Sequence, residues 1–296
     1  MTKSNSKNPT SNLQSVICNH LSALADKYEN KEFLVGDPSW FMHQVKGDTN
    51  KELFAFIASA ISYGSRKQFL PKIESLRIEG DYIQWLRNRD YEAIVPHTDE
   101  CFYRLYTKAM MNDFLNALAQ MIEQYGSMRG YMESVRDNLH TTKLTALEAV
   151  KAITAWFAEH GSVGVIPKDA TSSCKRVCMF LRWMVRDNSP VDLGIWSDLI
   201  DKRTLIIPMD THVQQEAVKL GLISSKSTSM SAALKLSQKL REIWPDDPIK
   251  GDFALFGVGV APEKMKNEKL KMKNACRSER IKNEKLIINN TCRSEG

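Results

Sequence analysis

The stretch LIIPMDTHVQQEAVKLGL, residues 205–222, joins an apolar run to the start of a helix. Pro208 disfavours helical backbone in the residue before it, so the apolar run and the helix are separate elements. Asp210 then stands where helices prefer a capping side chain. A carboxylate held there stays ionised, because free backbone N–H groups and the helix dipole favour the anion. Such a group suits chemistry in which positive charge develops nearby, although most aspartates at this position only cap.

Apolar residues at helical spacing recur along most of the chain. Runs in which apolar and polar residues strictly alternate are scarce, so we expect few strands. The sequence therefore predicts a mainly α fold with one helical domain over residues 13–260, preceded by a disordered N-terminus over residues 1–12. The segments with helical spacing are 13–29, 51–76, 106–125, 145–161, 174–187, 210–222 and 229–244.

Length and composition exclude several classes of protein. The 296 residues are enough for one large or two modest domains with a sizeable core. No uninterrupted apolar run approaches the roughly 18 residues of a membrane span. The polar start, MTKSNSKNPTSN, lacks the apolar centre of a signal peptide. We therefore expect a cytoplasmic, monomeric protein with no membrane partner.

The segment 261–296 repeats itself and carries most of the net charge. KNEKLKMKNACRSE (266–279) recurs as KNEKLIINNTCRSE (282–295), with ten of fourteen positions identical. Ten Lys/Arg and five Asp/Glu lie in this tail, while the whole chain has a net charge of +6. We expect a disordered or loosely helical tail, with a basic arm that grips DNA as the alternative. An argument for DNA binding must rest on local patches rather than on the total charge.

Lys175 opens the helix predicted over residues 174–187. The helix dipole disfavours a cation at that end, and a lysine with more free amine is a better nucleophile. A solvated surface lysine is the simpler interpretation of this position alone.

Two cysteines, Cys174 and Cys178, lie close to Lys175 in the sequence. Two buried free thiols are favoured over a metal site because no CxxC pair occurs in the chain.

Other polar and aromatic side chains have a structural and a functional interpretation each. Arg182 and Arg186, four apart on the same helix, either form ion pairs or contact DNA. His212 lacks the partners of a metal site, and we interpret it as a hydrogen-bonding support. Aromatic side chains stack on flipped bases in some proteins, but core packing is favoured for the tryptophans considered, which are Trp40, Trp183 and Trp196.

Two segments together resemble the helix-hairpin-helix DNA glycosylases, the superfamily of endonuclease III and the 8-oxoguanine glycosylases. IPKDATSSCKRVCMFL (166–181) is similar to the hairpin and helix that carry the family's nucleophilic lysine, which gives that role to Lys175. IIPMDTHVQQEA (206–217) is similar to the segment that carries its catalytic aspartate, which gives that role to Asp210. FAFIASAISYGSRKQFLPKIESL (54–76) resembles the early helix and the DNA-contacting turn that follows it, here Tyr63, Gly64, Ser65, Arg66 and Gln68.

Further strings resemble a bacterial branch of this superfamily whose substrate is not established: CKRxxMFLRWMVR, VDLGIW, PMDTHV and DFALFGVG. The hairpin departs from the family, because residues 169–173 replace the usual Gly-x-Gly. The hydroxyls of Ser172 and Ser173, with Arg176, are then expected to hold a DNA phosphate at the helix N-terminus. The separation of Lys175 and Asp210 is similar to that in the archaeal 8-oxoguanine glycosylases. The cysteine pattern gives no iron–sulfur cluster.

The resemblance implies a two-lobed helical fold with a cleft, and a base-excision-repair enzyme acting on double-stranded DNA with a damaged base. Lys175 would form a Schiff base, Asp210 would stabilise the sugar cation, and Tyr63 and His212 would support them. No metal and no diffusible cofactor is implied. The alternatives are a non-catalytic nucleic-acid-binding or interaction module, and a helical protein in which Asp210 only caps. The sequence does not identify the lesion.

Overall fold

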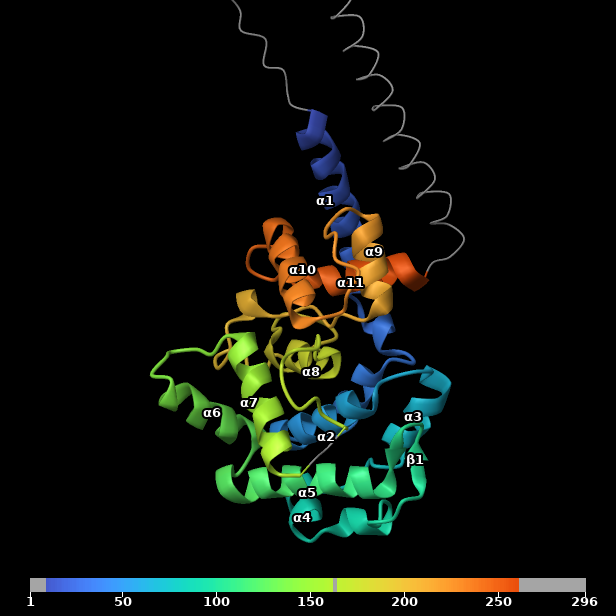
Figure 1. Ribbon diagram of the computed structural model, residues 1–296, viewed down its shortest axis with the longest axis vertical. Helices are drawn as coiled ribbons and strands as arrows, with labels where there is room; N and C mark the ends of the chain where they lie inside the picture. Colours follow the sequence, from blue (N-terminus) through green and yellow to red (C-terminus); the bar gives the residue numbers. More distant parts are fainter. Residues whose placement is uncertain (1–8, 162–163, 261–296) are drawn as a thin grey trace, which may run out of the picture.

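The computed structural model of the chain describes residues 9–161 and 164–260, and this part is mainly helical (Figure 1). The predicted mainly α class is therefore confirmed. Two short antiparallel strands, β1 (Cys101–Tyr103) and β2 (Tyr106–Thr107), form a hairpin. The α-helices are α1 (Pro9–Tyr28), α2 (Asp48–Ile61), α3 (Arg66–Glu74), α4 (Tyr82–Arg87), α5 (Lys108–Tyr125), α6 (Met128–Asn138), α7 (Ala146–Glu159), α8 (Lys175–Val185), α9 (Thr211–Lys219), α10 (Met230–Ile243) and α11 (Lys250–Val260). The 3₁₀ helices are η1 (Lys31–Leu34), η2 (Pro38–His43), η3 (Asp90–Ala93) and η4 (Lys202–Thr204).

Side-chain caps explain where several of these helices begin. Thr107, Ser127 and Ser229 each accept a hydrogen bond from a backbone N–H in the first turn of α5, α6 and α10. Thr145 and Glu148 form a reciprocal capping box at the start of α7. These caps satisfy backbone donors that have no partner inside a helix, so the sequence fixes the starts of these helices locally.

The segment with helical spacing over residues 51–76 forms two helices in the structure. α2 ends at Ile61 and α3 begins at Arg66, and the turn between them contains Gly64 with φ +81°. A Cβ at Gly64 would lie 2.4 Å from the Arg104 guanidinium and 2.9 Å from the Tyr103 hydroxyl. Glycine therefore meets both a backbone and a packing requirement here. Apolar periodicity alone runs through this break, whereas the sequence analysis expected a turn over residues 63–68 after the first helix.

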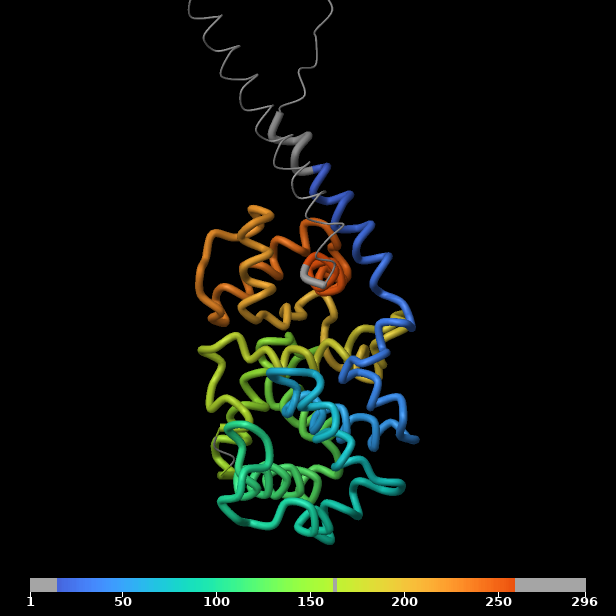
Figure 2. The backbone as a smooth tube through the Cα atoms, turned by 90° about the vertical axis from the view of Figure 1, so that its right-hand side faces the viewer, coloured from blue at the N-terminus to red at the C-terminus, as the bar shows by residue number. Residues whose placement is uncertain are grey.

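The two ends of the described chain pack together (Figures 1 and 2). Buried residues of α1 and α11 form a separate small apolar cluster: Leu21, Leu24, Ala25, Ala254 and Val258. The first described residue, Pro9, already lies in α1. Residues 9–12, which the sequence assigned to a disordered N-terminus, are thus helical. The predicted tail, 261–296, lies outside the described residues.

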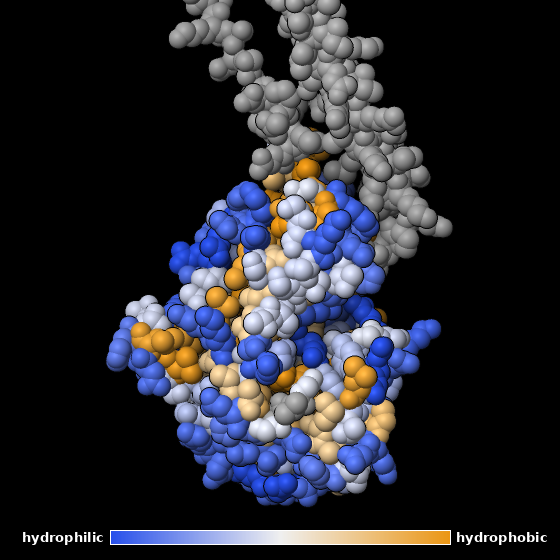
Figure 3. All heavy atoms as spheres, viewed as in Figure 1, coloured by the Kyte–Doolittle hydropathy of each residue, from blue (hydrophilic) through white to orange (hydrophobic). Residues whose placement is uncertain are grey.

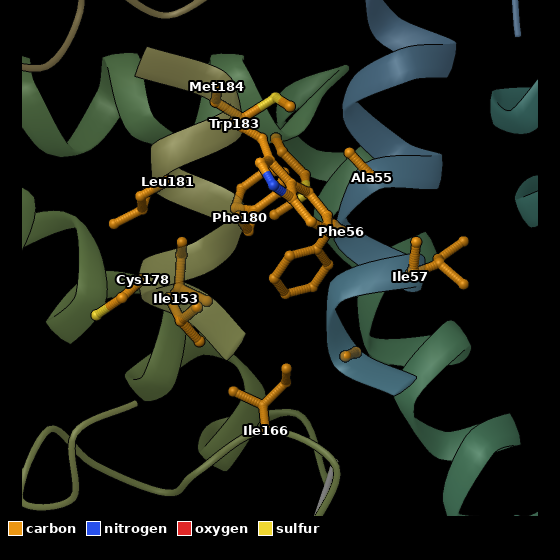
Figure 4. Packing of buried hydrophobic residues seen from close by; sticks show 14 of the residues in the cluster. Ala55, Phe56, Ile57, Ile153, Ile166, Cys178, Phe180, Leu181, Trp183 and Met184 are labelled. Carbon is orange, nitrogen blue, oxygen red and sulfur yellow. The ribbon is translucent and has the colours of Figure 1, made fainter. Parts of the chain in front are cut away.

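The main core joins α8 to α2, α5 and α7 (Figure 4). The Phe180 ring lies 5.0 Å from Phe56 of α2 and 5.2 Å from Trp196, measured between ring centroids. Trp183 and Trp196 are fully buried, which confirms the prediction that they pack in the core. Trp40 in η2 is 39% exposed, so its assignment to the core was wrong.

A buried arginine network links α8 to the C-terminal elements. Arg182 donates to Asp192 (3.2 Å) and to Asp252 of α11 (2.5 Å). Arg186 pairs with Asp192 (2.6 Å), Asp247 (2.7 Å) and Glu29 (2.8 Å). The two arginines thus form structural ion pairs rather than a DNA-contacting surface. We call these six residues the arginine network.

The face of the molecule seen in Figure 3 is mostly hydrophilic, with hydrophobic residues in separate patches. Among the helices of the described residues, none is both long and apolar enough to cross a membrane.

Candidate active site

A cavity of about 370 Å³ lies where α8, α9 and α11 meet the turn between α2 and α3. Its walls combine aromatic rings with charged side chains from segments far apart in the sequence. One face of α8 contributes Lys175, Met179 and Arg182, spaced four and three residues apart as a helix face requires. The other lining residues are Phe33, Asp37, Pro38, Ser62, Tyr63, Gly64, Arg66, Phe69, Pro208, Asp210, His212, Val213, Glu216, Asp252, Leu255 and Phe256.

Lys175 and Asp210 are in direct contact in this cavity. The Lys175 Nζ lies 2.7 Å from Asp210 Oδ2, and the two side chains remain 36% and 33% exposed. Lys175 is the first residue of α8, and Asp210 is the N-cap of α9. The structure therefore brings together the two residues that the sequence assigned to catalysis, although 35 positions separate them.

Asp210 is held as an anion by its surroundings. Its Oδ1 accepts a hydrogen bond from the Val213 backbone N–H at 2.9 Å, as a helix cap does. Burial raises the pKa of Asp210, but the charge and hydrogen bond of Lys175 together with the Val213 N–H outweigh burial. The pKa of Asp210 consequently lies below its usual value. Capping thus occupies one carboxylate oxygen and leaves the other facing Lys175.

Ser173 ties the Lys175 segment to the Asp210 segment. Its hydroxyl donates to the Met209 carbonyl at 2.8 Å, and its backbone N–H donates to the Thr228 carbonyl at 3.0 Å. Cys174 follows in a left-handed conformation with φ +46°, which is uncommon for a residue other than glycine. This sharp turn starts α8 immediately beside the loop that carries Asp210.

The residues predicted to contact DNA fall into two groups. Tyr63 and Arg66 line the cavity, while Gln68 and Ser172 are exposed but lie outside its lining. Arg66 is 45% exposed and lies 3.2 Å from Asp37. The turn over residues 64–68 is exposed throughout, so it forms a polar rim beside the cavity.

Ser173 and Arg176 have internal roles instead of the predicted surface contacts. Ser173 is 7% exposed and uses its hydroxyl inside the protein. Arg176 donates to the Ala60 carbonyl at 2.7 Å and lies over the rings of Tyr63 and Tyr106. Both side chains turn inward because buried carbonyl groups need donors. In the structure, the Ser173 hydroxyl and the Arg176 guanidinium therefore bond inside the protein, and their assignment to DNA binding stays a prediction.

His212 lines the cavity, but its side chain makes no hydrogen bond within the described residues. The role of hydrogen-bonding support assigned to it is not what the structure shows. His212 is exposed in the first turn of α9, where a positive charge on its ring lowers the pKa of Asp210. Tyr63 does have internal partners, since its hydroxyl donates to the Tyr103 carbonyl at 3.2 Å.

Asp252 is a charged group of the site that sequence reasoning missed. It lies in the first turn of α11, it lines the cavity, and its carboxylate contacts Arg182. Burial raises the pKa of Asp252 despite the opposing effect of Arg182 and Lys175. A signal was present, because two arginines four apart on an apolar helix require buried acidic partners. The sequence does not show which acids those are.

The cysteines in this region are free thiols. Cys174 and Cys178 are buried, as the sequence suggested, and burial raises the pKa of both. The residues that the structure describes contain no group of three or more His, Cys, Asp or Glu side chains placed to hold a metal ion.

The fold and cavity define a mainly helical protein with a lysine–aspartate pair at the junction of α8 and α9. The chain belongs to the family described as "Protein of unknown function (DUF2400)", whose model matches residues 37–261. The match includes Lys175, Asp210 and Asp252, so every part of the charged site lies within it. No curated protein and no solved structure matches the chain.

Proposed function

We propose that this protein is a DNA glycosylase with AP-lyase activity, acting in base excision on double-stranded DNA. The observation that carries the proposal is the 2.7 Å contact between Lys175 and Asp210 inside a cavity with aromatic walls. A nucleophile and an acidic partner in contact within a cavity are the arrangement that covalent catalysis requires. The two-lobed glycosylase-like fold, with the cavity as its cleft, is part of this proposal.

The chemistry follows from the two side chains. A flipped nucleotide enters the cavity, and Lys175 attacks its C1′ as the free amine after its ammonium has released a proton to water. Asp210 stays anionic and stabilises the positive charge that develops on the sugar. It then accepts the proton that the nitrogen loses after the attack. Opening of the sugar gives the Schiff base from which strand cleavage proceeds.

The cavity walls suit a flipped base. Phe33, Phe69 and Phe256 provide apolar ring surface on which a base stacks. The exposed polar rim over residues 64–68 supplies Arg66 beside the entrance, where it would contact a phosphate. Ser172 and Gln68 are exposed and available for the same purpose.

A non-catalytic DNA-binding module is the second candidate. Two observations favour it: Arg176 turns inward, and the hairpin before α8 has no glycine between residues 165 and 174. Each observation removes a contact with the DNA backbone that the resemblance to the glycosylases implies. A binding module, however, gives no reason for a lysine to contact an aspartate in a partly exposed cavity.

Borohydride trapping on labelled duplexes tests the proposal. The panel contains 8-oxoguanine, uracil, oxidised pyrimidines, alkylated purines and an abasic site. We expect a covalent adduct with the wild type and none with Lys175→Gln. Lys168→Gln, which removes an exposed lysine outside the cavity lining, is the matched control and should trap normally. An adduct that persists in Lys175→Gln would place the nucleophile elsewhere.

Asp210→Asn separates catalysis from folding. Asparagine also caps helices, so the start of α9 should be kept. We expect at least a roughly 100-fold loss in the rate of base release with duplex binding unchanged. Normal cleavage by this variant would reduce Asp210 to a helix cap. Duplex binding without an adduct or base release on any substrate would favour the binding module.

A further inference from the structure

The cavity contains a second carboxyl group whose position differs from that of Asp210. Asp252 projects from the first turn of α11, and its side chain is 12% exposed. Its Oδ2 accepts a hydrogen bond from Arg182 at 2.5 Å, while its Oδ1 has no hydrogen-bond partner within the described residues. One oxygen of Asp252 is therefore anchored, and the other remains available to a molecule in the cavity.

The arginine network contains more carboxyl groups than guanidinium groups. Arg182 and Arg186 face Glu29, Asp192, Asp247 and Asp252. Two positive charges do not neutralise four negative ones, so protonation of one carboxyl group lowers the electrostatic energy of the network. Asp252 adjoins Asp210 in the cavity, which adds a further negative charge at this carboxyl group.

Two carboxyl groups in one cavity are thus driven toward opposite protonation states. The pKa of Asp210 is lowered by Lys175 and the Val213 N–H against the effect of burial, whereas burial dominates at Asp252 and raises its pKa. Paired carboxyl groups whose surroundings separate their pKa values divide the roles of acid and base in many enzymes. Asp210 is suited to remain the anion and Asp252 to carry a proton.

We propose that Asp252 is the general acid of the reaction, which contacts the flipped base and gives it a proton as it leaves. The inference rests on the proposed glycosylase function. The bond between C1′ and the base nitrogen breaks, and its electron pair goes to the base. The Asp252 proton neutralises the base, while Lys175 forms the new bond to C1′. Asp252 is left as a carboxylate beside Arg182 and recovers a proton from water before the next turnover.

Leaving groups that differ in charge test this role. Uracil, hypoxanthine and 8-oxoguanine leave as anions unless they receive a proton, whereas 7-methylguanine is already cationic in the nucleotide. We expect Asp252→Asn to lower release of the neutral bases by about 100-fold or more, the usual range of general acid catalysis. Release of 7-methylguanine should change by no more than a few fold.

Asp247→Asn is the matched control. Asp247 also pairs with a network arginine, Arg186 at 2.7 Å, but it does not line the cavity. Both variants replace one acidic partner of a network arginine by an amide, and the melting temperature of each variant shows how far its fold is weakened. Only Asp252→Asn should slow the release of neutral bases much more than the release of 7-methylguanine.

Trapping on an abasic duplex distinguishes failure of this inference from failure of the proposed function. No base leaves from that substrate, so Asp252→Asn should trap at the wild-type rate. Normal trapping with equal loss for every base, or with no loss, would overturn the role of Asp252 alone. Wild-type trapping without release of any base would overturn the role of Asp252 and the glycosylase part of the proposed function, and would leave only a lyase. Absence of both trapping and base release would overturn both proposals.

Discussion

Glu52 offers a test of how a buried charge affects the stability of this fold. It lies in α2, is 3% exposed, and accepts hydrogen bonds from the backbone N–H groups of Met128 and Arg129 and from the Trp196 indole. Burial raises the pKa of Glu52 from 4.5 to about 7, because these hydrogen bonds only partly offset the lost hydration. We predict that Glu52→Gln changes the pH dependence of unfolding.

The magnitude follows from linkage. The folded state binds a proton more tightly than the unfolded chain, so this group makes the protein less stable as the pH rises from 4.5 toward 7. Integrated between pH 5 and pH 8, the difference between the two pKa values corresponds to roughly 2 to 3 kcal/mol. Glutamine is neutral throughout, so the free energy of unfolding of Glu52→Gln, relative to wild type, should rise by that amount over this range.

Urea unfolding of wild type and Glu52→Gln at pH 5, 6, 7 and 8 measures this difference. The histidines and the other acidic residues are the same in both proteins. Their effects on the free energy of unfolding therefore cancel in the difference between the two proteins. Glu148→Gln is the control, since Glu148 also accepts a hydrogen bond from a backbone N–H at a helix start but is only partly buried. Its pH profile shows the effect of the same substitution at a carboxyl group that is not fully buried. If the free energies of unfolding of wild type and Glu52→Gln changed with pH in parallel, the predicted effect of the buried Glu52 carboxyl group would be refuted.

Three further predictions concern other parts of the fold. Gly194→Ala should destabilise the protein by about 1–3 kcal/mol in urea unfolding, because Gly194 has φ +66° and a Cβ there would lie 2.7 Å from the Asp187 Cα; unchanged stability would contradict this. Iodoacetamide labelling of the native protein, followed by peptide mapping, should modify exposed Cys101 and spare Cys178, whose thiol is buried and has a raised pKa. Ser173→Ala should lower the melting temperature and the trapping rate together, since removing its hydroxyl leaves a buried carbonyl unpaired at a cost of about 1–3 kcal/mol; loss of stability with normal trapping would limit Ser173 to a structural role.

The parts of the fold that sequence predicts well are those fixed by local interactions. The start of α9 follows from Pro208 and Asp210 together, and α8 from the spacing of its apolar residues. Both segments form the expected helices, and the structure places Lys175 and Asp210, the two residues that the sequence assigned to catalysis, in contact. Helix periodicity alone gave no reason for that contact.

The features that were missed depend on contacts between distant residues. Asp252 and Arg182 are 70 positions apart, and Trp196 lies 144 positions from Glu52. Neither pairing leaves a periodic pattern in the sequence. The inward turn of Arg176 is of the same kind, because it depends on the Ala60 carbonyl, which only the packed α2 brings within reach.

The position of the proposed catalytic pair, Lys175 and Asp210, depends on both faces of α8. One face packs Phe180 and Trp183 into the core, and the other carries Lys175 and Arg182 along the cavity. Arg182 holds Asp252 through an ion pair, so the same helix sets the distance between the proposed nucleophile and the proposed acid. A charged network this deeply buried contributes little net stability. In the proposed mechanism, the network has the role of holding Asp252 at the wall of the cavity.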